Sequence, residues 1–94
     1  MERVILSIRC GTLEAHLDRI EQASDTQERS RRAIDLSGLA DKVLSLTPKS
    51  AFSEDEYQTL ESNLEHIALA VFIENLDWAR QSLNNVKELT RELF

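Results

Sequence analysis

The chain has 94 residues and a formal net charge of -6, and 41% of its residues are hydrophobic. A chain of this length forms at most one domain, so we expect a single domain over residues 1–94. It contains two Gly and one Pro. This argues against an all-β fold, whose many turns rely on those residues. The acidic balance makes nucleic acid an unlikely partner, because binding to phosphates normally needs a basic surface.

Several other classes of protein are disfavoured by the residue types present. Cys10 is the single cysteine, which excludes an internal disulfide and a Cys/His metal module. No apolar run approaches the roughly 20 residues that span a bilayer, and the N-terminal segment lacks the features of a signal peptide. We therefore expect no metal, no cofactor and no membrane contact, and a cytoplasmic location.

The first predicted helix covers residues 2–24. Its apolar residues recur every three or four positions, which is the pattern of one buried helix face. These residues are Leu6, Cys10, Leu13, Leu17 and Ile20. Residues 3–9 could instead form a short strand, because Val4, Ile5 and Ile8 are β-branched.

The second predicted helix covers residues 26–47 and ends before Pro48, since the residue before a proline avoids the helical region. Ser24 and Asp25 can each begin a capping box there. Its predicted apolar face is Ala33, Leu36, Leu39, Ala40, Val43, Leu44 and Leu46.

The third and fourth predicted helices cover residues 54–74 and 77–93. Ser53 with Glu56 three residues later predicts a capping box at the start of the third. The connections after the first and third helices are short, so each pair should form an antiparallel hairpin. The predicted fold is all-α, a small antiparallel four-helix bundle built from two helical hairpins.

The end of the third helix is apolar on all sides, because residues 67–73 read IALAVFI. A helix in a four-helix bundle normally hides only one face. The surplus surface predicts a homodimer, a groove for another protein, or complete internal burial. Val4, Ile5 and Ile8 give the first helix a similar surplus.

Two histidines raise the question of catalysis. A histidine phosphotransfer domain is also a helical bundle, but its His is followed by a Lys-Gly pair, whereas His66 is followed by Ile67-Ala68. No Glu-x-x-His pair of a di-metal bundle is present. We expect no catalytic residue. A small helical enzyme or phosphorelay-like protein using His16 or His66 stays an alternative.

The sequence therefore predicts a non-enzymatic acidic interaction protein that binds and controls another macromolecule, of the antitoxin, immunity, chaperone or phage-inhibitor type. A purely structural oligomerisation module is a further alternative. The predicted acidic faces would steer a protein with a basic surface; they are Glu14, Asp18 and Glu21 on the first helix, and Glu54, Asp55, Glu56, Glu61 and Glu65 on the third. The predicted partner-binding residues are Phe72, Ile73, Leu76, Trp78, Glu61 and Glu65.

Overall fold

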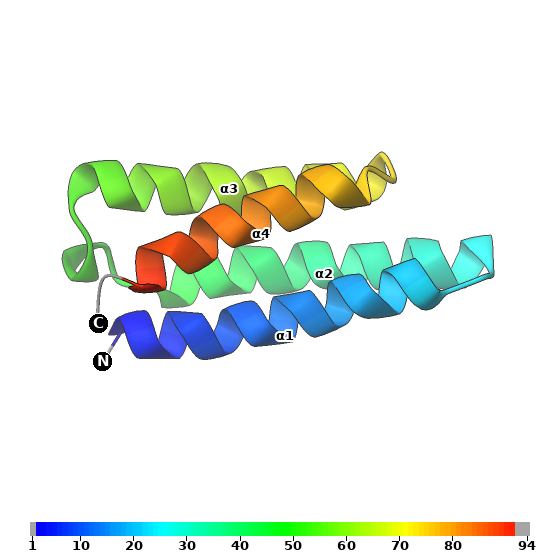
Figure 1. Ribbon diagram of the computed structural model, residues 1–94, viewed down its shortest axis with the longest axis horizontal. Helices are drawn as coiled ribbons and strands as arrows, with labels where there is room; N and C mark the ends of the chain where they lie inside the picture. The colour runs from blue at the N-terminus through cyan, green and yellow to red at the C-terminus, as the bar shows by residue number, and fades with distance from the viewer. Residues whose placement is uncertain (1, 92–94) are drawn as a thin grey trace.

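The computed structural model describes residues 2–91. Its four α-helices are α1 (Glu2–Gln22), α2 (Thr26–Leu46), α3 (Glu54–Phe72) and α4 (Leu76–Arg91), with a short 3-10 helix η1 (Lys49–Ala51) before α3 (Figure 1). The described residues contain no strand, so the predicted all-α class is confirmed. Residues 3–9 are helical, which excludes the strand alternative.

The helices run up, down, up and down, and each packs on its two neighbours: α1 on α2 and α4, and α3 on α2 and α4. The α1–α2 hairpin forms one layer and the α3–α4 hairpin the other (Figure 1). The α1–α2 turn projects beyond the α3–α4 turn at the same end of the molecule. The result is an elongated bundle of 40 × 20 × 20 Å.

The core is formed by the helix stripes that the sequence predicts. Leu13, Leu36, Leu60 and Leu83, one from each helix, are at most 1% exposed. Leu46 was expected on the buried face of α2 but is 51% exposed. Thr47, one residue later, is buried instead, and its hydroxyl donates to the Val43 carbonyl at 2.7 Å. One residue rotates a helical side chain by about 100°, and this turns Leu46 outward.

Local capping fixes where the helices begin. Ser53 accepts from the Glu56 amide and the Glu56 carboxylate accepts from the Ser53 amide, so the predicted capping box is confirmed. Asp25 caps α2 by accepting from the Gln27 amide. The side chain of Asn75 accepts from the Trp78 amide at the start of α4.

The helix ends differ from prediction at the α3–α4 turn. The Asn75 amide donates to the Ala70 carbonyl and the Glu74 amide to the Val71 carbonyl, the two bonds of a Schellman motif. This motif ends α3 at Phe72, where the sequence predicted residue 74. It places Glu74 at φ 58°, a left-handed conformation usually taken by Gly. The predicted end of the fourth helix at residue 93 lies outside the described residues.

Candidate functional site

The α3 patch, which we define as Leu69, Phe72 and Ile73, is the exposed part of the apolar helix end. These side chains are 52%, 56% and 58% exposed. Ile67 and Ala70, in the same run, are fully buried. Complete internal burial of the run, one of the predicted alternatives, is therefore wrong. The cause is the packing order: α3 packs on α2 and α4, and no other element of residues 2–91 covers its outer side.

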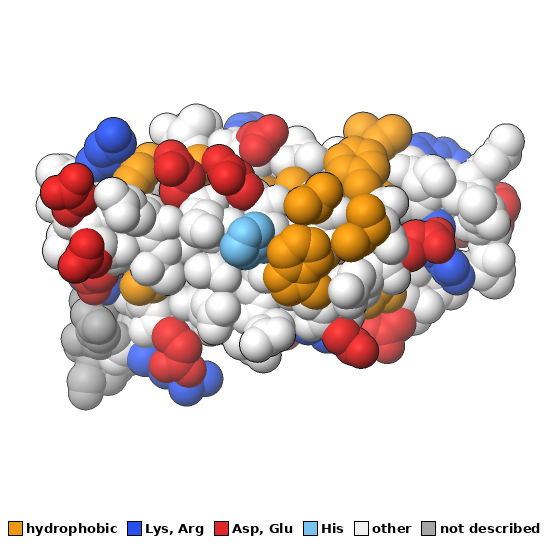
Figure 2. All heavy atoms as spheres, turned by 90° about the horizontal axis from the view of Figure 1, so that it is seen from above, with side chains coloured by type: hydrophobic (Ala, Val, Ile, Leu, Met, Phe, Trp, Pro, Cys, Tyr) orange, Lys and Arg blue, Asp and Glu red, His pale blue; other side chains and the backbone are white. Residues whose placement is uncertain are grey.

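The patch has a defined place on the outer face of the α3–α4 layer. Figure 2 shows hydrophobic side chains gathered toward the end of this layer that holds the α3–α4 turn. Acidic side chains occupy much of the other half of the same face. An apolar surface bordered by charged residues is typical of a protein-binding site.

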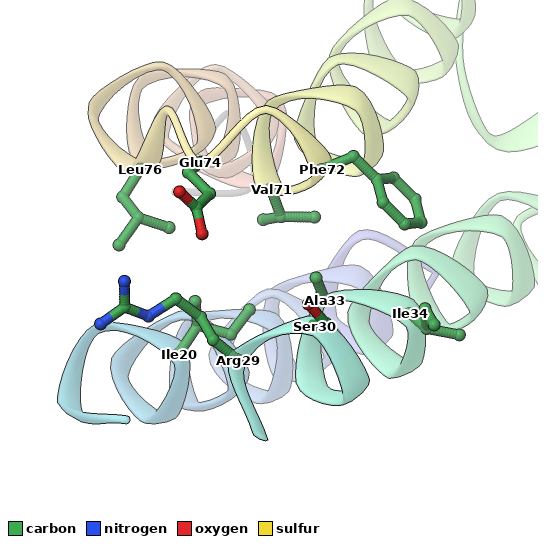
Figure 3. A pocket seen from close by; sticks show the side chains of 9 residues that line it. All are labelled: Ile20, Arg29, Ser30, Ala33, Ile34, Val71, Phe72, Glu74 and Leu76. Atoms are coloured by element: carbon green, nitrogen blue, oxygen red, sulfur yellow. The ribbon is translucent and has the colours of Figure 1, made fainter. Parts of the chain in front are cut away.

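A groove of about 210 Å³ lies between α2 and the α3–α4 turn, next to the patch (Figure 3). Its apolar lining is Ile20, Ala33, Ile34, Val71, Phe72 and Leu76. Ile34 is 60% exposed and lies across the groove from Phe72. We call this space the α2–α3 groove. Together with the α3 patch it forms one continuous apolar surface, because Phe72 belongs to both.

Polar groups close one end of the α2–α3 groove. The Arg29 side chain rises from α2 and Glu74 descends from the α3–α4 turn (Figure 3). The guanidinium of Arg29 donates to the Ala23 carbonyl at 2.7 Å, which caps the end of α1. Its buried Nε has no hydrogen-bond partner, and an unsatisfied buried donor is costly. The left-handed backbone of Glu74 adds strain at the same place.

Trp78 borders the α3 patch on the α4 side. Its ring lies 5.2 Å from the ring of His66, tilted by 39°. His66, Leu69 and Ile73 follow one another at spacings of three and four, so they share one side of α3. Trp78 is half-buried and packs against the core, so it contributes to the bundle and is only partly accessible to a partner.

The acidic faces predicted from the sequence are not equally available. On α1, Asp18 and Glu21 both accept from Arg80 of α4, at 2.8 and 2.6 Å, and Glu14 pairs with Lys87. Hydrogen bonds to Asp18 and Glu21 raise the pKa of Arg80. The α1 carboxylates therefore join α1 to α4, while Asp18 and Glu21 stay 51% and 58% exposed; their steering of a basic partner stays a prediction.

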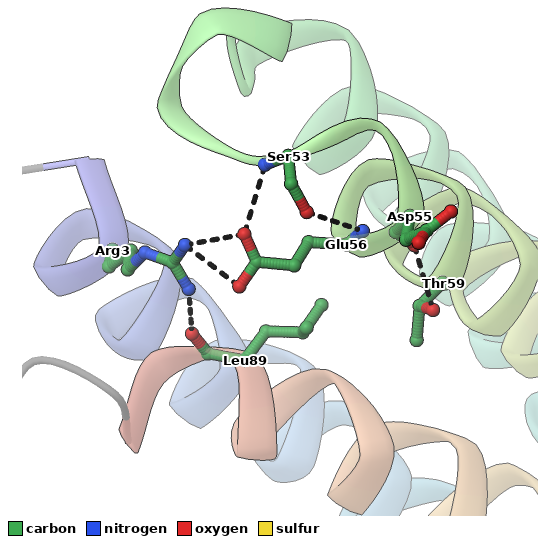
Figure 4. Close-up of polar contacts among 6 residues, drawn as sticks. All are labelled: Arg3, Ser53, Asp55, Glu56, Thr59 and Leu89. Atoms are coloured by element: carbon green, nitrogen blue, oxygen red, sulfur yellow. Dashed lines mark hydrogen bonds and ion pairs between the residues drawn. The ribbon is translucent and has the colours of Figure 1, made fainter.

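Glu56 of α3 also acts within the fold (Figure 4). It receives two hydrogen bonds from Arg3, at 2.8 and 2.9 Å, while Arg3 also donates to the Leu89 carbonyl at 2.6 Å. The Arg3 guanidinium lies 4.5 Å from the centre of the Phe52 ring. This cluster joins the first turn of α1 to the start of α3 and the end of α4.

Glu61 and Glu65 remain exposed and take part in no ion pair within 4 Å among residues 2–91. They lie eleven and seven residues before Phe72, respectively, a spacing that places all three on one side of α3. Of the predicted partner-binding residues, the structure brings Phe72 and Leu76 together in the groove. Ile73 lies in the adjoining patch.

The residues of this surface that were not among the predicted partner-binding residues include Arg29, Ile34 and Leu69. Ile34 is a large apolar residue outside the predicted apolar stripe of α2, and this position is the feature of the sequence that could have identified it. Leu69 lies inside the apolar run, but periodicity alone does not tell which members face outward. Arg29 belongs to a charged segment, ERSRR, whose local pattern does not indicate a contact with another helix. Only the meeting of α2 with the α3–α4 turn gives it a place in the groove.

The remaining candidate residues do not assemble into a reactive cluster within residues 2–91. His16 is half-buried on α1, on a different helix from His66. Burial raises the pKa of the Cys10 thiol to about 11, which keeps it protonated and unreactive near neutral pH. No group of three or more potential metal-ligating side chains occurs in the described residues. None of their helices is long and apolar enough to cross a membrane.

The chain was compared with known families, curated proteins and solved structures. No family, curated protein or solved structure matches it.

Proposed function

We propose that this protein is a non-enzymatic interaction protein that binds another protein through the α3 patch and the α2–α3 groove, and controls it by covering a surface. The observation that carries the proposal is the run of large apolar side chains left open at one end of the bundle. Leu69, Phe72, Ile73 and, across the groove, Ile34 are each more than half exposed.

Burial of this surface against a partner would contribute free energy to binding. Full burial of a Leu, Ile or Phe side chain contributes about 1.5–3 kcal/mol. Since these four are 52–60% exposed, covering them would contribute about 3.5–7 kcal/mol in total. Association of two proteins costs an estimated 4–15 kcal/mol. The patch alone therefore supports weak binding, and the surrounding polar contacts must add to it.

Photo-crosslinking in the native host tests the proposal. A photoreactive phenylalanine analogue at position 72 replaces an exposed aromatic side chain and should not disturb the core. The matched control carries the same analogue at Asn84, which is exposed on α4. We expect one dominant adduct with another protein from position 72 and none from position 84. No adduct from position 72, or the same set of adducts from both positions, would refute the proposed function.

The predicted homodimer is a competing use of the same surface. It would appear in the crosslinking experiment as an adduct of twice the mass of the chain. Sedimentation of the purified protein at increasing concentration separates the two arrangements. A dimer that Phe72→Asp dissociates would assign the surface to self-association and remove it from the proposed control of another protein.

A further inference from the structure

Two stripes of side chains extend along the bundle from the α2–α3 groove, one on α2 and one on α3, and we call the surface between them the channel. The α2 stripe is Ser30, Ile34, Ser37 and Asp41, and the α3 stripe is Glu61, Glu65, Ala68 and Phe72. Both follow spacings of four, three and four, which keeps each stripe on one side of its helix. In both stripes the third member is half-buried and the others are exposed.

The channel has an apolar end and an acidic end. Phe72 and Ile34 line the same groove, and α2 and α3 run antiparallel (Figure 1). Asp41 therefore lies toward the end of the channel that holds Glu61, and Glu65 lies one helical turn from Glu61 on α3. From Phe72 to Glu61 the helix rises by about 16 Å at 1.5 Å per residue. This length matches about three turns of a partner helix.

The carboxylates of Asp41, Glu61 and Glu65 supply the charge of the acidic end, and Lys49 lines a surface pocket together with Glu61. α3 contains no Lys or Arg. The cations that form ion pairs between helices pair with other carboxylates. These pairs are Arg3 with Glu56, Arg80 with Asp18 and Glu21, and Lys87 with Glu14. No ion pair within 4 Å involves Asp41, Glu61 or Glu65 in residues 2–91.

We propose that this channel binds a basic amphipathic helix of another protein, with apolar side chains between Ile34 and Phe72 and Lys or Arg side chains beside Glu61 and Glu65. This inference rests on the proposed function and names the chemistry of its partner. An amphipathic helix in a hydrophobic groove is a recurrent mode of recognition that uses anchors spaced three and four residues apart. The carboxylates supply orientation and a faster encounter, since exposed charges act mainly on specificity and on-rate.

Charge complementarity favours this occupant over a second copy of the chain. A two-fold dimer through the channel would fill it with the outer faces of α2 and α3 from the other copy. Those faces carry more exposed carboxylates than cations; the carboxylates are Asp35, Asp41, Glu54, Asp55, Glu61 and Glu65, and the cations Arg31 and Lys42. Like charges brought together at an interface are unfavourable.

Two synthetic helical peptides test the inference on the full chain. Each has about 14 residues, set by the rise of 1.5 Å per residue, and both carry the same Leu stripe. One has a Lys polar face and the other a Glu polar face. We expect the Lys peptide to bind at least about tenfold more tightly at low salt, with a preference that weakens as salt screens the charges. Amide shifts at Ile34, Glu65 and Phe72 should locate it in the channel.

Charge-reversed variants make the test specific. Glu61→Lys with Glu65→Lys should reverse the preference so that the Glu peptide binds more tightly. The matched control, Asp35→Lys with Glu88→Lys, changes the net charge equally at exposed positions outside the channel and should keep the preference for the Lys peptide. Equal loss of preference in both double variants would mean a response to net charge alone and would overturn the inference.

The remaining outcomes separate this inference from the proposed function. Binding of both peptides in the channel within about twofold of each other overturns the basic-helix inference and leaves the proposed function standing. Failure of both peptides to shift the channel amides overturns the inference too, and the crosslink from position 72 then decides the proposed function by itself. A dimer dissociated by Phe72→Asp would assign the channel to a second copy and overturn both.

Discussion

A pair of leucines one and a half turns apart on α3 offers a direct check of the exposed patch. Leu64 is 1% exposed and Leu69 is 52% exposed, so the same Leu→Ala change removes a core side chain at one position and a surface side chain at the other. Leu64→Ala should destabilise the fold by about 3 kcal/mol, within the usual range for a buried leucine. Leu69→Ala should cost less than about 1 kcal/mol, because half of its side chain is already in water and Ala is the better helix former.

Urea unfolding followed by circular dichroism and by Trp78 fluorescence measures both effects. For a small domain with a slope near 1.5 kcal/mol per M, the expected midpoint shifts are about 2 M for Leu64→Ala and less than about 0.7 M for Leu69→Ala. Each variant should be unfolded at low and high protein concentration. Equal costs for the two variants would refute the exposure of the patch. A cost for Leu69→Ala that grows with protein concentration would show instead that a second copy covers it.

Two further predictions concern buried polar groups. Arg3→Met and Glu56→Gln should each destabilise the fold by about 1.5–3 kcal/mol, because the two side chains are only 17% and 21% exposed and charge-assisted hydrogen bonds are lost. A double-mutant cycle by urea unfolding should give a coupling free energy of about 1–2 kcal/mol. A coupling below about 0.5 kcal/mol would contradict the contact. The Cys10 thiol should resist a disulfide reagent at pH 8 until urea is added, since burial raises its pKa from 9.0 to about 11. The stabilising contribution of the protonated thiol should be complete below pH 9 and decline as the pH rises toward 11. The wild type should therefore lose more stability over that range than Cys10→Ala. Thiol labelling at pH 8 as fast as in the unfolded chain would show that Cys10 is not buried.

Local sequence signals predicted most of the fold because they act between residues close in the chain. The capping box at Ser53 and the stop before Pro48 depend on neighbouring backbone groups. The buried stripe from Leu6 to Ile20 depends on helical periodicity. The end of α3 was predicted two residues too late, because the Schellman motif there uses Glu74 where glycine is the usual signal.

The candidate site was predicted only in part. Phe72 and Ile73 were identified because the helix end carries more apolar residues than one face can hide. Ile34 and Arg29 were missed because they join the groove through contacts with the α3–α4 turn, about 40 residues away in sequence and adjacent only in the packed bundle. Periodicity assigns a residue to a side of its helix, but it does not say which neighbour covers that side.

The sequence by itself thus determined four helices, their order, and a surplus of apolar surface near residue 72. Tertiary structure alone decided which carboxylates form ion pairs. Asp18 and Glu21 pair with Arg80, and Glu56 pairs with Arg3, whereas Glu61 and Glu65 form no ion pair within 4 Å in residues 2–91. The physical reason is that ion pairs between helices depend on the stagger and orientation of whole elements, which local spacing does not specify.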